Sequence, residues 1–116
     1  MSDEIDEIFS ESVNLAESFL VKNGEFYPFA IALSPDGESI LVHAFLDGEN
    51  PESDHLISVL RKGLSNGISK GTYISTAIIS DVKLRDRVTG ECRDAIRVVI
   101  EDGVSAPITC CIPYRI

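Results

Sequence analysis

The chain has no tryptophan, and only three cysteines and two histidines occur among its 116 residues. Two of the cysteines, Cys110 and Cys111, are adjacent, a spacing that seldom forms a bridge. We therefore expect free thiols and a cytoplasmic location, where thiols stay reduced. His43 and His55 lack the spacing with cysteine that zinc sites use, so no metal is predicted unless the fold brings a cysteine or Asp54 beside them.

The common catalytic and nucleotide motifs are also missing. No Gly-x-Ser-x-Gly turn, Gly-x-Gly-x-x-Gly loop or phosphate-binding Gly-Lys-Ser/Thr loop occurs. Residues 47–54 carry several oxygen ligands but lack the glycine and glutamate of an EF-hand loop. We predict no catalytic residue and no cofactor, although an enzyme built on a subtler arrangement stays open.

Long apolar runs are absent, because charge or glycine interrupts each within a few residues, far short of the roughly 20 that cross a bilayer. The first residues lack the positive start and apolar run of a secretory signal. We expect no membrane association, and the cytoplasm is the default location.

Basic residues are scarce in the front half of the chain. Residues 1–55 contain thirteen acids and one base, Lys22, whereas residues 56–116 contain six acids and nine bases. The two parts therefore carry net charges of −12 and +3. This asymmetry indicates surfaces of opposite sign and a side that faces a partner. The overall charge of −9 argues against binding of DNA or RNA.

The composition is that of an ordinary globular protein, and the apolar residues recur at regular intervals along the chain. Steps of three and four residues predict a helix from about Asp3 to Lys22 and a second from Pro51 to near Asn66-Gly67. Strands are predicted over 26–33, 39–46, 72–84, 95–101 and 106–114, and the first two form a hairpin around Ser34-Pro35-Asp36-Gly37. The chain thus reads as a single α+β domain, 1–116, of order helix-strand-strand-helix-strand-strand-strand.

Short connections predict one five-stranded antiparallel sheet with two helices. This order of elements is similar to the roadblock/longin type of sheet, in which strand 1 lies beside strand 5 in the order 2-1-5-4-3. The strand over 72–84 is apolar on both alternations, so we expect it to be covered on both faces. We place Ala30, Ala32, Ala77, Val99 and Cys111 on the face away from the first helix, where helix 2 or a second copy must cover them.

Two groups of residues are candidates for binding. The first is a group of basic residues near the end of the third predicted strand and on the fourth: Lys83, Arg85, Arg87, Arg93 and Arg97. These side chains face solvent, pair with the chain's own acids, or contact another molecule, and the sequence leaves these alternatives open. An aromatic group at the start of the first strand could form a small pocket, with Tyr27, His43 and Tyr114 as its polar side chains, or belong to the core.

Three stretches carry a resemblance to a known family: Asn23-Gly24-Glu25-Phe26-Tyr27-Pro28-Phe29-Ala30, residues 94–103 (DAIRVVIEDG), and Pro113-Tyr114. With the Asp81-Val82 end of the third strand, they resemble a small bacterial protein family without an assigned function. The resemblance implies a compact single domain and no particular chemistry.

Three functions remain open. The first is a non-enzymatic protein-interaction module that forms a homodimer. The second is an acidic inhibitor or immunity-type protein for a partner with a basic surface, since a negative field speeds association with a positive target. The third is a small-molecule binder or enzyme that uses Tyr27, His43 and Tyr114.

Overall fold

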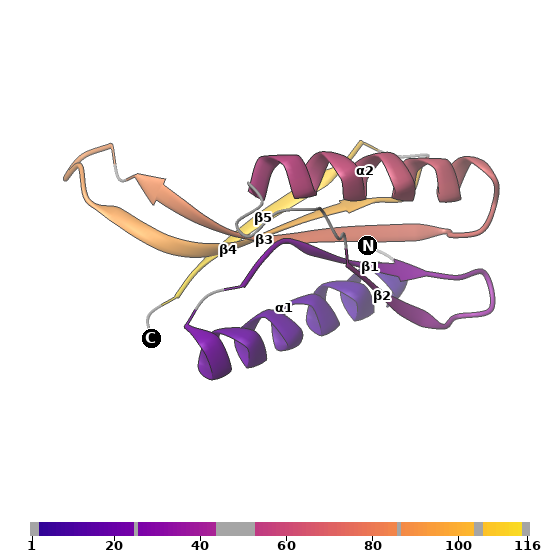
Figure 1. The fold of residues 1–116 in the computed structure, drawn as a ribbon, viewed down its shortest axis with the longest axis horizontal. Coiled ribbons are helices and arrows are strands. Elements are labelled where there is room, and N and C mark those ends of the chain that lie inside the picture. Colours follow the sequence, from indigo (N-terminus) through magenta and orange to yellow (C-terminus); the bar gives the residue numbers. More distant parts are fainter. Residues whose placement is uncertain (1–2, 25, 44–52, 86, 104–105, 115–116) are drawn as a thin grey trace.

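The computed structural model describes residues 3–24, 26–43, 53–85, 87–103 and 106–114. Two helices and five strands follow in the predicted order, which makes the chain an α+β protein (Figure 1). The elements are α1 Asp3–Asn23, β1 Phe29–Leu33, β2 Ser39–His43, α2 Ser53–Ser69, β3 Ser75–Arg85, β4 Cys92–Glu101 and β5 Ile108–Pro113. The predicted extension of the second strand to Leu46 lies outside the described residues.

All five strands form one antiparallel sheet in the order β2-β1-β3-β4-β5. The roadblock/longin order is therefore wrong for this chain, because β1 pairs with β3 and not with β5. The reason lies in side-chain burial. Residues 75–80 of β3 are all buried, as are all five residues of β1, so both strands belong in the centre. Pro107 precedes β5 and Pro113 ends it, and proline is tolerated at an edge.

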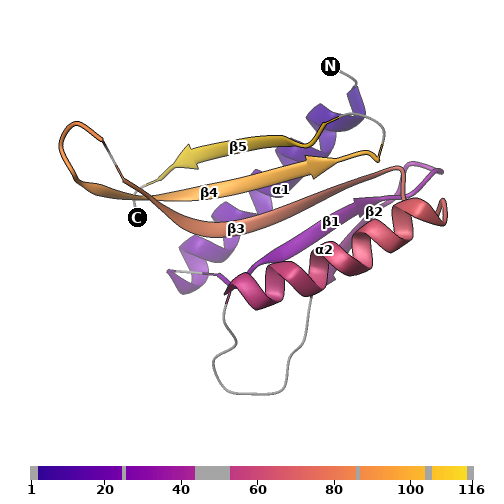
Figure 2. The same ribbon diagram turned by 90° about the horizontal axis from the view of Figure 1, so that it is seen from above.

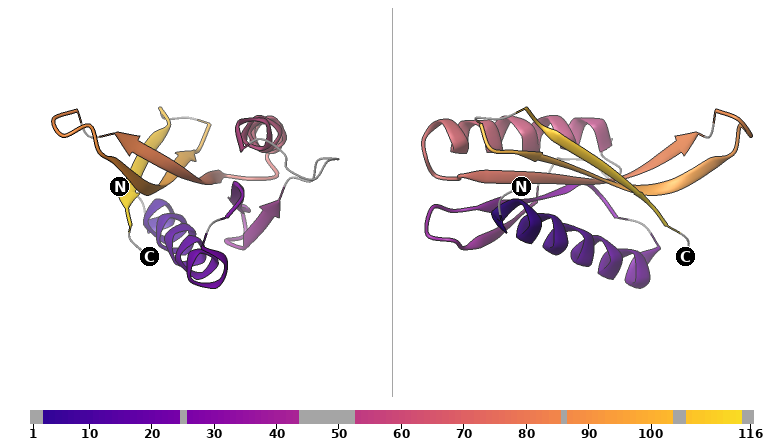
Figure 3. Two further views of the ribbon diagram at one scale, coloured as in Figure 1. Left: turned by 60° about the vertical axis from the view of Figure 1, so that its left-hand side comes forward. Right: turned by 180° about the vertical axis from the view of Figure 1, so that it is seen from behind.

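The two helices cover opposite faces of the sheet, as Figures 1 and 3 show. On the α1 face, Phe29 is fully buried, and its ring packs edge-on against Phe19 and Phe26, with centroids 5.2 and 5.6 Å away. Burial of each such large side chain contributes roughly 1.5–3 kcal/mol. The buried cluster on this face comprises Ile8, Ala16, Leu20, Phe29, Ile31, Leu33, Ala77, Ile79, Ile96, Val98 and Ile100. Ala77 was thus wrongly assigned to the far face.

Helix α2 covers only part of the opposite face. Leu60 and Leu64 pack against Ala30, Ala32 and Ile78, which belong to β1 and β3. Seen from the α2 side, the helix lies along the β1 half of the sheet and leaves β4 and β5 uncovered (Figure 2). One face of the sheet therefore carries a second, smaller core and an open area beside it.

Helix α2 continues through Asn66-Gly67, where we predicted its end, and stops before Gly71, which has a φ of 78°. Inside the last turn, Gly67 lies directly against the ring of Tyr73. The backbone N–H groups of Thr72 and Tyr73 both donate to the carbonyl of Gly67, at 2.9 and 3.3 Å. Gly67 therefore marks a close approach of the chain to the helix, not a helix end.

Strands β3 and β4 form a long hairpin whose tip projects beyond both helices (Figure 1). The predicted loop from Arg85 to Arg93 is shorter in the structure, because β4 already begins at Cys92, which pairs with Arg85. We call residues 82–94 the hairpin arm. Its side chains from Arg87 to Asp94 are exposed, which makes the arm the part of the sheet with least cover.

Candidate ligand groove and interaction surfaces

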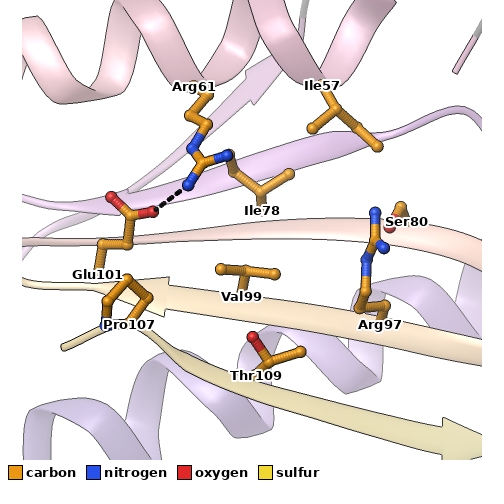
Figure 4. A pocket seen from close by; sticks show the side chains of 9 residues that line it. All are labelled: Ile57, Arg61, Ile78, Ser80, Arg97, Val99, Glu101, Pro107 and Thr109. Carbon is orange, nitrogen blue, oxygen red and sulfur yellow. Dashed lines mark ion pairs between the residues drawn. The ribbon is translucent and has the colours of Figure 1, made fainter. Parts of the chain in front are cut away.

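A groove of about 290 Å³ lies where α2 stops short of β4 and β5 (Figure 4). Helix α2 forms one wall, and the open face of β3, β4 and β5 forms the floor, because the apolar side chains of the helix pack on the β1 and β3 side of the sheet, with Val42 of β2 beside them. The lining residues are Ile57, Arg61, Ile78, Ser80, Arg97, Val99, Glu101, Pro107 and Thr109.

The two-residue period of strand β4 places a charged side chain at each end of the groove. Arg97, Val99 and Glu101 alternate along β4, so all three side chains lie on the α2 side. Arg97 and Glu101 are four residues apart, which corresponds to about 13 Å of strand. Val99 lies between them, and Ile57 and Ile78 complete an apolar middle section. The groove is thus cationic at one end, apolar in the middle and ion-paired at the other end.

The ion pair at the far end joins α2 to the sheet. Arg61 Nη2 lies 3.6 Å from Glu101 Oε1, with the side chains 64% and 23% exposed. A pair this open to solvent contributes little to stability, about 0–1 kcal/mol. Its relevance is electrostatic, because it neutralises Glu101, the one carboxylate among the described residues that line the groove.

Arg97 has an unusual environment for a cation. It is half-buried on β4, directly opposite the buried Ser80 on β3 and the exposed Cys111 on β5. Its Nε is shielded from solvent and has no hydrogen-bond partner within the described residues. A buried donor without a partner costs about 1–3 kcal/mol, more in a charged group. Because this Nε is shielded, an anion in the groove would meet the terminal N–H groups of the guanidinium.

The other four basic residues of the predicted group lie elsewhere. Lys83, Arg85, Arg87 and Arg93 belong to the hairpin arm, and all four side chains are exposed. Lys83 faces Asp94 in the β3–β4 register, but the described residues show no ion pair at this position. The structure therefore divides the sequence cluster into a solvent-facing arm and one groove residue, Arg97.

The aromatic candidates are spread over the sheet. His43 ends edge strand β2, with its ring 6.2 Å from that of Phe29, and Tyr114 follows the opposite edge strand, β5. The hydroxyl of Tyr114 donates to Asp81 Oδ1 at 2.7 Å, and Tyr27 is 57% exposed. None of the three lines the groove. A shared ligand pocket for these residues stays a prediction, and the structure does not bring His43 and Tyr114 together.

The described part of the chain contains no cluster of three or more His, Cys, Asp and Glu side chains that could hold a metal ion. Cys92, Cys110 and Cys111 are free thiols. The oxygen-rich segment weighed as a calcium loop, residues 47–54, lies mostly outside the described residues. Among the helices described, none has the length and apolar content needed to cross a membrane.

Strand β2 presents an apolar edge that the sequence pattern did not reveal. In the described residues it pairs with β1 alone, through Ala30–Val42, Ile31–Leu41 and Ala32–Ile40. Ile40 and Leu41 are 39% and 46% exposed although they point to opposite faces. The available signal was the uncharged run Ser39-Ile-Leu-Val, which lacks the lysine or proline that commonly protects an edge strand.

The groove residues Ile57, Arg61, Val99 and Glu101 were also not among the predicted site residues. Each belongs to a periodic element and looks like an ordinary amphipathic position, so only the packing of α2 on the sheet identifies them. No protein-family model, curated protein or solved structure matches the chain. The resemblance to a bacterial family of unassigned function accordingly stays a prediction.

Proposed function

We propose that the chain is a non-enzymatic protein-interaction module whose copies associate through edge strand β2. The observation that carries this proposal is the exposed apolar edge, where Ile40 and Leu41 remain 39% and 46% open to solvent. An unprotected edge of this kind is a template for pairing with another strand. The other edge, β5, is bounded by Pro107 and Pro113 and is less suited to extension.

The hairpin geometry favours a second copy as the pairing partner. Ser34 N–H donates to the Glu38 carbonyl at 2.9 Å, which makes this a hydrogen-bonded pair. Because such pairs alternate along an antiparallel ladder, the backbone groups of Leu41 point away from β1 toward the free edge. A twofold axis at Leu41 would pair this residue with itself and Ile40 with Val42 of the second copy. Each exposed apolar residue would then meet an apolar partner.

The expected dimer is weak. Five residues from each copy bury less than the roughly 1,200 Å² of standard stable interfaces. Each chain also carries a net charge of −9, so two copies repel, although β2 itself contains no Asp, Glu, Lys or Arg. We expect a dissociation constant in the micromolar range, and tighter association as salt screens the repulsion.

Sedimentation equilibrium of the wild type and two variants tests the proposal. Leu41→Lys places a charge at the centre of the edge and should give a monomer at all concentrations. Val59→Lys is the matched control, because Val59 is equally apolar and 39% exposed, but lies on α2. It should leave the dimer unchanged, and circular dichroism should show both variants folded.

A Leu41→Cys variant supplies a second measurement. In a hydrogen-bonded antiparallel pair the two Cα atoms lie about 5.5 Å apart, within disulfide range. Under mild oxidation this variant should therefore form a covalent dimer through position 41. A wild type that is monomeric at a concentration on the order of 100 µM, or a Leu41→Lys variant that still dimerises, would contradict the proposal.

The acidic surface of α1 supports a second candidate function, the binding of a partner with a basic surface. Asp6, Glu7 and Glu17 are exposed, and none forms an ion pair within the described residues. Neutralisation of all three, as Asp6→Asn, Glu7→Gln and Glu17→Gln, should abolish affinity capture of a basic protein that the wild type retains at low salt. Capture that is insensitive to both salt and these substitutions would count against this function.

A further inference from the structure

The groove beside α2 combines an unsatisfied cation with an apolar wall. Arg97 rises from β4 on the side of α2, close to Ser80, in the view of Figure 4. Its Nε is buried and lacks a hydrogen-bond partner in the described part of the chain. The two terminal nitrogens of a guanidinium also offer N–H groups as a planar fork, which a carboxylate accepts with both oxygens. The donor at this end of the groove therefore fits a planar oxyanion.

The charge balance of the lining favours a ligand with one negative charge. Among the described residues, two arginines and one glutamate line the groove, and Arg61 already pairs with Glu101 at 3.6 Å. One positive charge, that of Arg97, is left over. A monocarboxylate compensates this charge, whereas a phosphate dianion would bring a second negative charge for which the lining holds no free cation.

The size and polarity of the groove restrict the rest of the ligand. At about 290 Å³, the groove is at the small end of ligand sites. From Arg97 toward Glu101, its lining is formed mainly by the apolar side chains of Ile57, Ile78 and Val99, with Thr109 beside Val99 on β5. A second carboxylate at the far end would approach Glu101, so a dicarboxylate is disfavoured.

We propose that this groove binds a small organic monocarboxylate with a short aliphatic chain. The carboxylate accepts from the two terminal N–H groups of Arg97, and the chain lies against Ile57, Ile78 and Val99. The site is separate from the β2 edge, since β4 and β5 occupy the other end of the sheet order. The inference therefore does not depend on self-association.

Titration with three probes that share a six-carbon chain tests the charge and shape of the ligand. Hexanoate, hexanol and hexyl phosphate are added to ¹⁵N-labelled full-length protein, and amide shifts are followed by NMR. Hexanoate should bind with a submillimolar to millimolar dissociation constant and shift amides of residues 97–101 and of the α2 wall. Hexanol should bind about 10-fold to 100-fold more weakly, which is the range of a charge-assisted pair.

Three arginine variants separate the effect of the specific contact from the effect of net charge. Arg97→Gln should weaken hexanoate binding about 10-fold to 100-fold. Arg93→Gln is the matched control, because it removes the same charge from the same face of β4 but lies on the hairpin arm. It should leave hexanoate affinity within about 2-fold. Arg97→Lys keeps the charge without the planar fork and should fall between wild type and Arg97→Gln.

Several results would overturn the inference. These are no hexanoate binding up to the solubility limit of the probe, equal affinity for hexanol, tighter binding of hexyl phosphate, or equal losses in Arg97→Gln and Arg93→Gln. If Arg97→Gln unfolds, Arg97→Lys and Ile57→Ser replace it as tests, and unchanged hexanoate affinity in both would refute the site. Loss of binding in a folded Arg97→Gln, with Arg93→Gln unaffected, supports it.

Discussion

Two glycines of helix α2 should respond to the same substitution with opposite signs. Gly63 and Gly67 lie one turn apart, and replacement by alanine favours the helix by up to about 1 kcal/mol at an interior position. A Cβ at Gly63 would meet no atom within 4 Å. A Cβ at Gly67 would overlap the Cδ2 and Cε2 atoms of Tyr73.

The Tyr73 ring cannot move away at low cost. It packs against the second core, whose members include Leu64 and Ile78, and the backbone N–H groups of Thr72 and of Tyr73 itself both donate to the Gly67 carbonyl. Overpacking of this kind costs typically 1–3 kcal/mol. We therefore expect Gly63→Ala to raise the free energy of unfolding by up to about 1 kcal/mol, and Gly67→Ala to lower it by about 0–2 kcal/mol.

Urea unfolding followed by far-ultraviolet circular dichroism measures both changes, with the slope against urea as a check that the unfolded state is unaltered. Tyr73→Ala provides the decisive background. With the ring removed, Gly67→Ala should become neutral or stabilising, so the two substitutions should be coupled by about 1–3 kcal/mol. Equal stabilisation by Gly63→Ala and Gly67→Ala in the wild type would refute the packing of Tyr73 on the helix.

Two further stability predictions concern the α1 face. Tyr114→Phe removes the 2.7 Å hydrogen bond to Asp81 and should lower the free energy of unfolding by about 1–2 kcal/mol. The control Tyr27→Phe, at a residue 57% exposed, should change it by less than about 0.5 kcal/mol. Equal effects of the two substitutions in urea unfolding would argue against the Tyr114–Asp81 hydrogen bond. Phe29→Ala, at a fully buried residue in contact with Phe19 and Phe26, should cost about 3–5 kcal/mol, and a loss below about 1 kcal/mol would place the core elsewhere.

Local pattern predicted most of the elements because each depends on nearby residues. The period of Ile8, Ser12, Ala16 and Leu20 identifies the buried stripe of α1, and all four are at most 4% exposed. The Ser34-Pro35-Asp36-Gly37 segment forms a hairpin turn in which Gly37 has a φ of 88° and its N–H donates to the Ser34 carbonyl. Errors fell at boundaries such as Gly67, where a distant side chain, Tyr73, decides whether the helix continues.

The candidate site was far less predictable. Arg97 stood out in the sequence only as one of five bases, and nothing local separates it from Arg93, which has the same parity on β4. Arg97 faces Ser80 within the body of the sheet, beside a groove whose opposite wall belongs to α2, whereas Arg93 lies on the arm. That difference depends on where helix α2 packs, and its groove residues Ile57 and Arg61 precede Arg97 by 40 and 36 residues.

The sequence by itself determined the α+β class, the alternation of the strands and the separation of acidic from basic residues along the chain, because periodicity and composition are local properties. Only the tertiary structure decided the strand order β2-β1-β3-β4-β5, the cover that α2 gives to one half of a face, and the exposed edge at Ile40 and Leu41. Strand pairing joins residues far apart in the chain, so the choice between β3 and β5 as the neighbour of β1 depends on which strand buries both of its faces.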